Sequence, residues 1–288
     1  MIVITDSRCI EYGTRGHPER PQRISRTIDR LKNQKEIQID WECPLPVNDV
    51  SILRAHSDAH LQRVSEPVDF DADTPAYPLI AEHARRSVGA ALKALEFARH
   101  GKIAFSLMRP PGHHAERNQA MGFCYFNQIA IAALEAVATG FKRVAIYDFD
   151  VHHGNGTEEI LMQHSHCTFF SIHQYPAYPG TGARSLYNCY NYPVPPGIPR
   201  GEYRGRFEEA LAELQQWKPD LVAVSAGFDA YRGDPLSEES LEIEDFHWLG
   251  QSIRNLQIPS FHVLEGGYSL DLPELILAYL KGLEGLSL

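Results

Sequence analysis

The chain has 288 residues, of which 43% are hydrophobic, enough to bury the core of a large α/β domain. No apolar run approaches the roughly 20 residues of a membrane-spanning helix, and residues 1–6 lack the basic and apolar regions of a secretion signal. The formal net charge of -10 argues against nucleic acid as a partner, and five scattered cysteines without a Cys-x-x-Cys pair predict reduced thiols and a cytoplasmic location.

Short β-branched runs alternate with helical patterns along the chain. The runs are nearly all apolar, as strands of a parallel sheet covered on both faces should be. The alternation predicts a single α/β domain over residues 1–288, built on one open, mostly parallel sheet with helices on both faces. In chain order, the predicted elements are strand Ile2–Thr5, helix Arg20–Asn33, helix Leu79–Arg99, strand Ile103–Met108, helix Ile129–Thr139, strand Arg143–Asp148, strand Thr168–His173, helix Arg204–Trp217, strand Leu221–Ala226, helix Ile243–Leu256, strand Ser260–Leu264 and helix Leu272–Gly282.

One stretch interrupts the alternation. Residues Tyr175–Gly201 are rich in proline and glycine, and we expect a long loop there, because strand and helix patterns resume only afterwards. Loops of this length are uncommon unless they are functional. In open α/β sheets, ligands bind beyond the carboxyl ends of the strands, so the residues that follow the strands are the candidates for a site.

Four of the predicted strands are followed by unusually polar sequences. These sequences are Arg109–His114, Asp148–Gly156, Ala226–Asp229 and Glu265–Tyr268. Asp150 and His152 are two residues apart, and on an extended chain such residues point to the same side. Carboxylate and imidazole groups are zinc ligands, and a catalytic zinc keeps three protein ligands and one open position. Asp229 is the best candidate for the third ligand; the alternative is that these polar residues only cap strands.

Other residues at the same strand ends suggest proton transfer. His113 and His114 follow a Pro-Pro-Gly turn that can aim them rigidly. They could be two surface residues, but beside a metal their imidazoles could take a proton from water and return it to a leaving amine. Tyr268 follows two glycines and is either a buried aromatic residue or a hydroxyl donor to a developing oxyanion.

Together, these motifs resemble the histone deacetylase family in the broad sense that includes bacterial deacetylase-like proteins and acetylpolyamine amidohydrolases. The resemblance implies an arginase-like α/β fold and a hydrolase with one zinc per chain that removes acetyl, or another short acyl group, from an amine nitrogen. It extends in order over nearly the whole chain, through Gly16–Arg23, Arg109–Asn127, Tyr147–Thr157, Tyr178–Gly182, Ser225–Leu236 and Leu264–Leu270.

The resemblance also implies individual roles. The zinc ligands and catalytic residues that it implies are Asp150, His152, Asp229, His113, His114 and Tyr268. The residues that it implies for the acyl-lysine tunnel and an inner cavity for acetate are Gly122, Phe123, Tyr178 and, in the inner cavity, Arg23. A structural monovalent cation, usually potassium, would be held by Asp148 and Ser171 with backbone carbonyls of Asp150, His152 and Ile172.

Asn155 is a departure from the eukaryotic nuclear branch of the family, which carries an aspartate there. We expect His113 to pair with Asp148 and His114 to pair with Asn155. An amide carries no negative charge and would stabilise a protonated His114 less than a carboxylate would. Asn155 and Glu265 both resemble the class II and bacterial branch.

The substrate is the least specified part of the resemblance. Polyamine-selective relatives carry a glutamate at the position of Leu236, so we expect acyl-lysine as the substrate, with acetylpolyamines or another small acetylated amine as the alternative. Asp71 or Asp73 could hold the substrate, or could be a solvated acid near the start of a helix.

Two other functions compete with this interpretation. A two-metal ureohydrolase on the same fold needs further bridging acids, but the segments His152–Gly154 and Asp229–Tyr231 lack them. A non-catalytic acyl-lysine binder would not need Tyr268 and the two adjacent histidines, which speak against it.

Overall fold

The computed structural model describes all 288 residues. Its centre is an eight-stranded sheet in the order β2-β1-β3-β8-β7-β4-β5-β6, and every neighbouring pair of strands is parallel. The open parallel sheet predicted from the sequence is therefore confirmed. The strands are β1 Ile2–Ile4, β2 Asp40–Glu42, β3 Ala104–Ser106, β4 Val144–Asp148, β5 Cys167–Gln174, β6 Cys189–Val194, β7 Leu221–Ala226 and β8 Ser260–Leu264.

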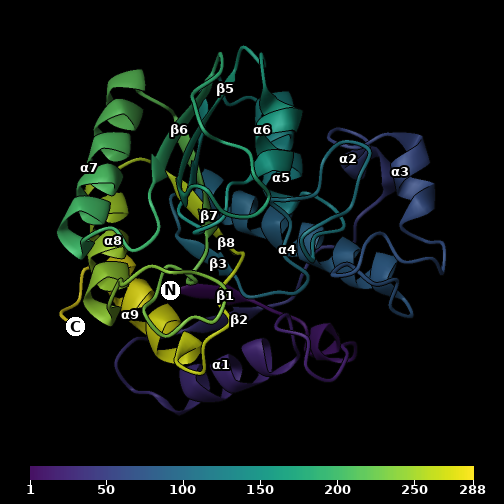
Figure 1. Ribbon diagram of the computed structural model, residues 1–288, viewed down its shortest axis with the longest axis horizontal. Coiled ribbons are helices and arrows are strands. Elements are labelled where there is room, and N and C mark those ends of the chain that lie inside the picture. The colour runs from purple at the N-terminus through teal and green to yellow at the C-terminus, as the bar shows by residue number, and fades with distance from the viewer.

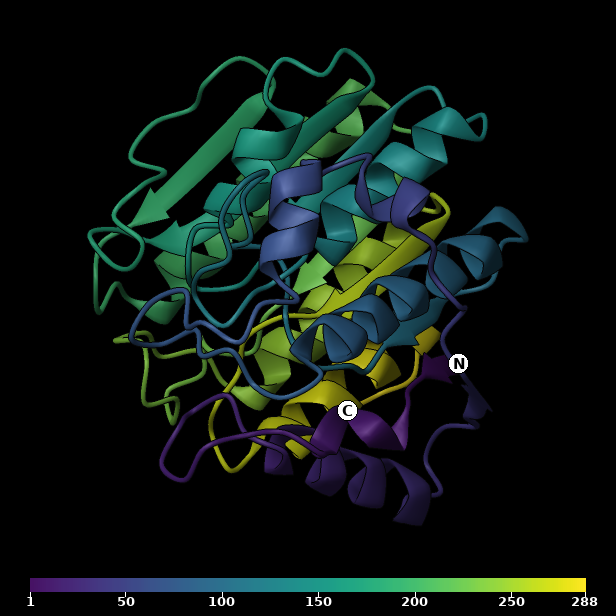
Figure 2. The same cartoon turned by 90° about the vertical axis from the view of Figure 1, so that its right-hand side faces the viewer.

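Helices cover both faces of the sheet (Figure 1). Helices α4, α5 and α6 pack on one side, and α1, α7, α8 and α9 form the layer on the other (Figure 1). Figure 2 shows the strands side by side, with α4 in front of them. No helix has both the length and the apolar composition needed to cross a membrane. The helices are η1 Ser7–Ile10, α1 Gln22–Asn33, α2 Asp49–Ile52, α3 Asp58–Arg63, α4 Ile80–Arg99, α5 Gln128–Ala138, α6 Asn155–Leu161, α7 Arg200–Trp217, α8 Ile243–Asn255 and α9 Leu272–Glu284.

The stretch Tyr175–Gly201 is not a continuous loop. It contains β6, which pairs with β5 at the edge of the sheet, and α7 begins within it at Arg200, four residues before the predicted start at Arg204. The polar residues and the proline of β6 conceal the strand in the sequence, but an edge strand tolerates both because one side has no partner to pair with. The prediction of one uninterrupted loop was wrong, and the true loop runs over residues 175–188.

A buried ion pair fastens the N-terminal loop to the sheet. Arg109, three residues after the end of β3, donates from Nε and Nη2 to the two carboxylate oxygens of Glu19, and both side chains are buried. Nη1 of Arg109 donates to the backbone oxygens of Cys9 and Tyr12 at 2.8 and 3.0 Å. Burial alone would raise the pKa of Glu19, but Arg109 outweighs it and holds the pKa below its ordinary value.

Removal of the Glu19 carboxylate should therefore destabilise the fold. Glu19→Ala leaves the buried Arg109 guanidinium without its counter-charge, which typically costs about 3–5 kcal/mol. Urea unfolding at pH 7 measures the loss, and the exposed Glu208→Ala serves as control, with an expected change within about 0.5 kcal/mol. Because the Glu19 pKa is lowered in the folded state, its contribution is complete above the unfolded-state pKa of about 4.3 and is lost as pH falls further. A constant difference between the two proteins from pH 7 to pH 3 would contradict this account.

Candidate active site

The polar segments that follow β3, β4, β7 and β8 meet at the carboxyl edge of the sheet. They border a cavity of about 210 Å³. The lining comes from segments far apart in the sequence, so the cavity exists only in the folded chain. The lining residues are Asp73, His114, Gly122, Phe123, His152, Tyr178, Leu236 and Tyr268.

Asp150, His152 and Asp229 converge beside this cavity. Their ligand atoms lie within 4.8 Å of one another, and the structure contains no other such group of three His, Cys, Asp or Glu residues. Nδ1 of His152 is 3.2 Å from Oδ1 of Asp150 and 3.1 Å from Oδ2 of Asp229. Ligand atoms around a tetrahedral zinc ion lie about 3.4 Å apart. The donor set and its spacing therefore fit a zinc ion, and His152 opens the centre onto the cavity.

The ring of His152 offers Nδ1 to this centre. Its Nε2 lies 3.3 Å from the backbone oxygen of Leu236, which can only accept, so Nε2 carries a hydrogen and Nδ1 is the nitrogen left to take a metal ion or a second proton. Burial disfavours the charged ring, but the hydrogen bonds with Asp150 and Asp229 outweigh it and raise the pKa of His152 well above its ordinary value. The two carboxylates thus create a field that attracts positive charge, whether a proton or a metal ion.

Backbone hydrogen bonds aim both carboxylates. Asp150 accepts from the Gly266 N–H at 2.7 Å, and Asp229 accepts from the Val151 N–H at 2.9 Å, so each acid keeps its other oxygen for the centre. A Cβ atom at Gly266 would lie only 2.1 Å from Oδ2 of Asp229. Only glycine lets the backbone approach this closely, which explains the Gly-Gly sequence after β8.

His114 is held as a neutral base. Nδ2 of Asn155 donates to Oε1 of Glu116 at 2.8 Å, which turns the Asn155 oxygen toward Nδ1 of His114, also at 2.8 Å. Because that oxygen accepts, Nδ1 carries the hydrogen and Nε2 keeps a lone pair. Burial lowers the pKa of His114 well below its ordinary value, and the neighbouring His113 and His152 lower it further. The predicted pairing of His114 with Asn155 is therefore present, and it leaves Nε2 of His114 free to accept a proton.

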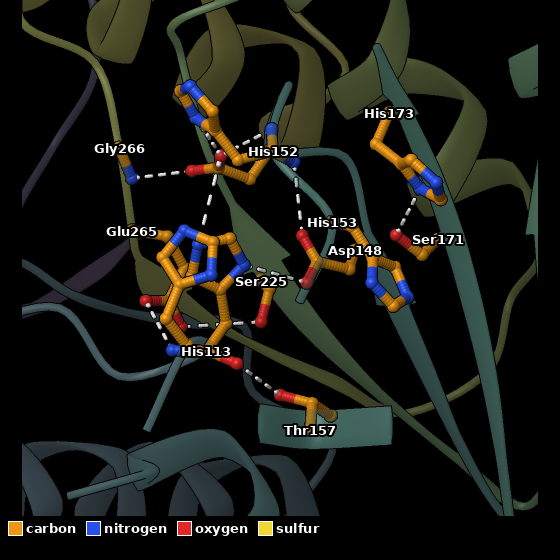
Figure 3. A network of polar contacts seen from close by, with 12 residues as sticks. His113, Asp148, His152, His153, Thr157, Ser171, His173, Ser225, Glu265 and Gly266 are labelled. Carbon is orange, nitrogen blue, oxygen red and sulfur yellow. Dashed lines mark hydrogen bonds and ion pairs between the residues drawn. The ribbon is translucent and has the colours of Figure 1, made fainter. Parts of the chain in front are cut away.

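His113 has the opposite electrostatic surroundings. Its Nδ1 lies 3.0 Å from Oδ2 of Asp148, and its backbone N–H donates to Glu265 at 3.2 Å (Figure 3). Burial opposes a charge on the ring, but Asp150 and Asp148 outweigh it and raise the pKa of His113 to about 10. A cation held by Asp150 would offset part of that field. The two adjacent histidines are thus differentiated, His114 as a proton acceptor and His113 as the more positive group.

Tyr268 lines the cavity with its hydroxyl protonated. Burial raises the pKa of Tyr268 well above its ordinary value, so the phenol can donate a hydrogen bond at neutral pH. The buried guanidinium of Arg23 lies 4.7 Å from the centre of the Tyr268 ring and donates to the Gly267 oxygen at 2.7 Å. Arg23 therefore supports the segment that carries Tyr268.

Two aromatic rings, those of Phe123 and Tyr178, line the cavity. The Phe123 ring lies 5.7 Å from the Tyr268 ring, and the Tyr178 ring lies 5.1 Å from the His114 ring. Of the two acids considered from the sequence, Asp73 lines the cavity and Asp71 accepts from the Asp73 N–H at 2.9 Å.

Comparisons with known proteins show the family of the chain. The family described as the histone deacetylase domain matches residues 17–283. A probable deacetylase from Methanothermobacter thermautotrophicus is 36% identical in an alignment 305 positions long, which covers 99% of this chain and 91% of that protein. The chain belongs to the histone deacetylase family.

Solved structures place this member of the histone deacetylase family firmly on the arginase-like fold. The HD domain of HDA15 matches with a TM-score of 0.92 at 32% identity, covering 99% of this chain and 89% of that one. An acetylpolyamine aminohydrolase from Burkholderia pseudomallei also reaches 0.92, at 27% identity, covering 99% of both chains. The predicted fold and family are confirmed, and with them the class of deacetylase-type hydrolases.

The residues that the histone deacetylase resemblance implied for a monovalent cation also lie together. Asp148 and Ser171 are register partners on the neighbouring strands β4 and β5. The ring of His173 donates from Nε2 to the Gly182 oxygen, so its Nδ1 accepts from the Ser171 hydroxyl at 2.8 Å, which leaves the Ser171 lone pairs free. Ile172 follows on the same buried strand. Potassium at this place stays a prediction.

Sequence reasoning missed one residue that organises this histone deacetylase-family site. The Asp234 carboxylate accepts from the N–H groups of Tyr268 at 2.6 Å, Ser269 at 3.1 Å and Leu236 at 3.0 Å. It therefore ties the tyrosine segment to the rim of the cavity. The only signal in the sequence is a Gly-Asp-Pro turn, which predicts a turn but not its partners.

Proposed function

We propose that this protein is a zinc-dependent deacylase that removes acetyl, or another short acyl group, from the side chain of acyl-lysine in a protein or peptide. The observation that carries the proposal is the convergence of Asp150, His152 and Asp229 beside a cavity of about 210 Å³ that also presents His114 and Tyr268. A zinc ion at this centre would polarise the acyl carbonyl and acidify a water molecule.

The side chains around the centre divide the proton transfers between them. Nε2 of His114, with its lone pair, accepts the proton of the attacking water and returns it to the leaving amine. His113, paired with Asp148, supplies positive charge beside the developing negative charge. The Tyr268 hydroxyl donates a hydrogen bond to the oxyanion.

The lining of the cavity supports acyl-lysine as the substrate. Phe123 and Tyr178 offer apolar faces to a four-carbon stem, and Leu236 lines the cavity with an apolar side chain that is 38% exposed. Acetylpolyamines are the second candidate, because a structural relative acts on them according to its name and because Asp73 places one carboxylate on the lining. A single acid would pair with only one of the cationic amines of a polyamine.

One panel of assays tests both candidates. The purified protein with zinc is offered acetyl-lysine peptides, acetylpolyamines and longer acyl-lysines, each with and without a hydroxamate inhibitor. Hydroxamate-sensitive turnover that is fastest on acetyl-lysine supports the proposal. Faster turnover of acetylpolyamines would make them the preferred substrate instead. Peptide binding without any turnover indicates a non-catalytic binder. Two manganese ions per chain would indicate a ureohydrolase.

Replacement of the Tyr268 hydroxyl tests the oxyanion role. Loss of one donor to an oxyanion commonly costs about 3 kcal/mol, so Tyr268→Phe should lower kcat on the order of 100-fold. The ring keeps its contacts with Phe123 and Arg23, and zinc content should stay at one per chain. Steady-state kinetics with metal analysis measures both. Undiminished turnover would remove Tyr268 from the mechanism.

A further inference from the structure

The loop that carries the Tyr178 wall has almost no backbone support. It joins β5 to β6, and between residues 176 and 185 the only backbone–backbone hydrogen bond is internal, from the Gly180 N–H to the Ala177 oxygen at 2.8 Å. Tyr178 is 44% exposed. Side chains from outside the loop must therefore fix where this wall stands.

His153 provides one such attachment. Its ring is buried, with Nδ1 2.7 Å from the Thr181 hydroxyl oxygen and Nε2 3.3 Å from Oε2 of Glu158. The carboxylate favours the hydrogen on Nε2, so Nδ1 accepts from the hydroxyl of Thr181. The same Glu158 oxygen also accepts from Nδ2 of Asn191 at 2.6 Å. A chain of polar contacts thus leads from β6 through α6 to the loop.

A second buried ring lies beside the first. The His173 ring is 4.6 Å from the ring of His153 (Figure 3). Nε2 of His173 donates to the Gly182 oxygen at 3.0 Å. A Cβ atom at Gly182 would lie 2.4 Å from that nitrogen and 2.6 Å from Cγ of His153. Gly182 has φ +81°, so both space and backbone conformation require glycine. The loop rests directly on the two histidine rings, three and four residues after Tyr178.

The contact between His153 and Thr181 links the loop to the metal centre, because His153 is next to a proposed metal ligand in the sequence. His153 is the residue after His152, which offers Nδ1 to the metal centre, and the Tyr178 ring lies 6.4 Å from the ring of His152. We propose that His153 is a positioning residue, which fixes the position of the Tyr178 wall relative to the metal centre through the hydroxyl of Thr181. The inference rests on the proposed function, because it assigns the wall to substrate binding.

Thr181→Val tests this role with little risk to the fold. Thr181 is exposed, so the substitution removes the hydroxyl and leaves the two buried rings in place. A wall released from His153 binds substrate more weakly, so KM for an acetyl-lysine peptide should rise about fivefold, as expected for one lost hydrogen bond. Turnover should change by less than about twofold, because the proton-transfer groups are untouched. Thr181→Ser keeps the hydroxyl and should restore the original KM.

Two further measurements separate this role from a merely structural one. Amide hydrogen exchange over residues 177–184 should accelerate in Thr181→Val and not in Thr181→Ser. In a Tyr178→Ala background, the effect of Thr181→Val on KM should vanish, because the wall itself is gone. Unchanged exchange and KM in Thr181→Val, or an equal loss of kcat and zinc, would overturn the proposal. Absence of turnover in the unaltered protein would refute the proposed function, and the exchange measurement would still decide whether Thr181 holds the loop.

Discussion

Asp229→Asn is expected to cost the protein most of its zinc and to lower turnover by at least about 1,000-fold, since a Lewis-acid metal supplies several kcal/mol of transition-state stabilisation. The expected loss of zinc follows from one hydrogen bond. The Val151 N–H at 2.9 Å needs an acceptor, so it retains the oxygen of the new amide and turns the NH2 group toward Nδ1 of His152. A donor then occupies the position where the centre requires a lone pair.

The substitution should leave the fold intact. Asp229 is buried beside the like charge of Asp150, and burial together with that neighbour raises its pKa. An uncharged amide removes this repulsion and keeps the bond to Val151, so the unfolding midpoint of the metal-free protein should not fall. Metal analysis and kcat/KM are measured together, with the exposed Glu208→Gln as a control for the lost charge. Asp229→Asn that retained one zinc per chain and near-normal turnover would remove Asp229 from the centre.

Much of the centre could be predicted because its geometry is local. The prediction placed Asp150 and His152 on one side by the period of two of an extended chain. In the structure β4 ends at Asp148 and residues 150–152 bend, but the two residues still meet, because the His152 N–H donates to Oδ1 of Asp150 at 2.9 Å. The third ligand, Asp229, followed from a rule of topology, since the carboxyl ends of parallel strands share one edge of the sheet. Neither step required knowledge of a side-chain contact.

Other features depend on contacts between distant segments. The lone pair on Nε2 of His114 is decided by Glu116, which turns the amide of Asn155 at a distance of 2.8 Å. Nothing in the sequence pairs Glu116 with Asn155, 39 residues away. The bond from Asp234 to the Tyr268 segment spans 34 residues and was missed for the same reason. Hydrophobic periodicity identifies elements but not the partners of individual polar atoms.

The missed strand β6 has a different cause. Its sequence contains Asn191 and Pro193, which normally argue against a central strand. At the edge of the sheet, Asn191 can turn toward Glu158 instead of a neighbouring strand, and Pro193 has no ladder bond to lose on the open side. Sequence patterns identified the interior strands because those are buried along their whole length and mostly apolar, whereas an edge strand obeys weaker rules.

His114→Ala is expected to lower kcat by about 100-fold to 10,000-fold, the usual contribution of a general base. Zinc content should not change, because His114 bonds to Asn155 and not to the carboxylates of the centre. The matched variant is Asn155→Leu, which keeps the imidazole but removes the oxygen that holds its hydrogen on Nδ1. Without that oxygen, the tautomer and the aim of the ring are no longer fixed, so a smaller loss of about tenfold is expected.

Chemical rescue shows whether the missing group acts as a base. His114→Ala opens space on the lining of the cavity, next to Gly122 and Tyr178, where a free imidazole can enter. Added imidazole should restore part of the turnover of His114→Ala, with a rate that rises as the neutral form of imidazole increases with pH. It should have no such effect on Tyr268→Phe, in which the base is intact. Turnover of His114→Ala within tenfold of the unaltered protein would transfer the role of base to another group, and His113→Ala is the variant that would then identify it.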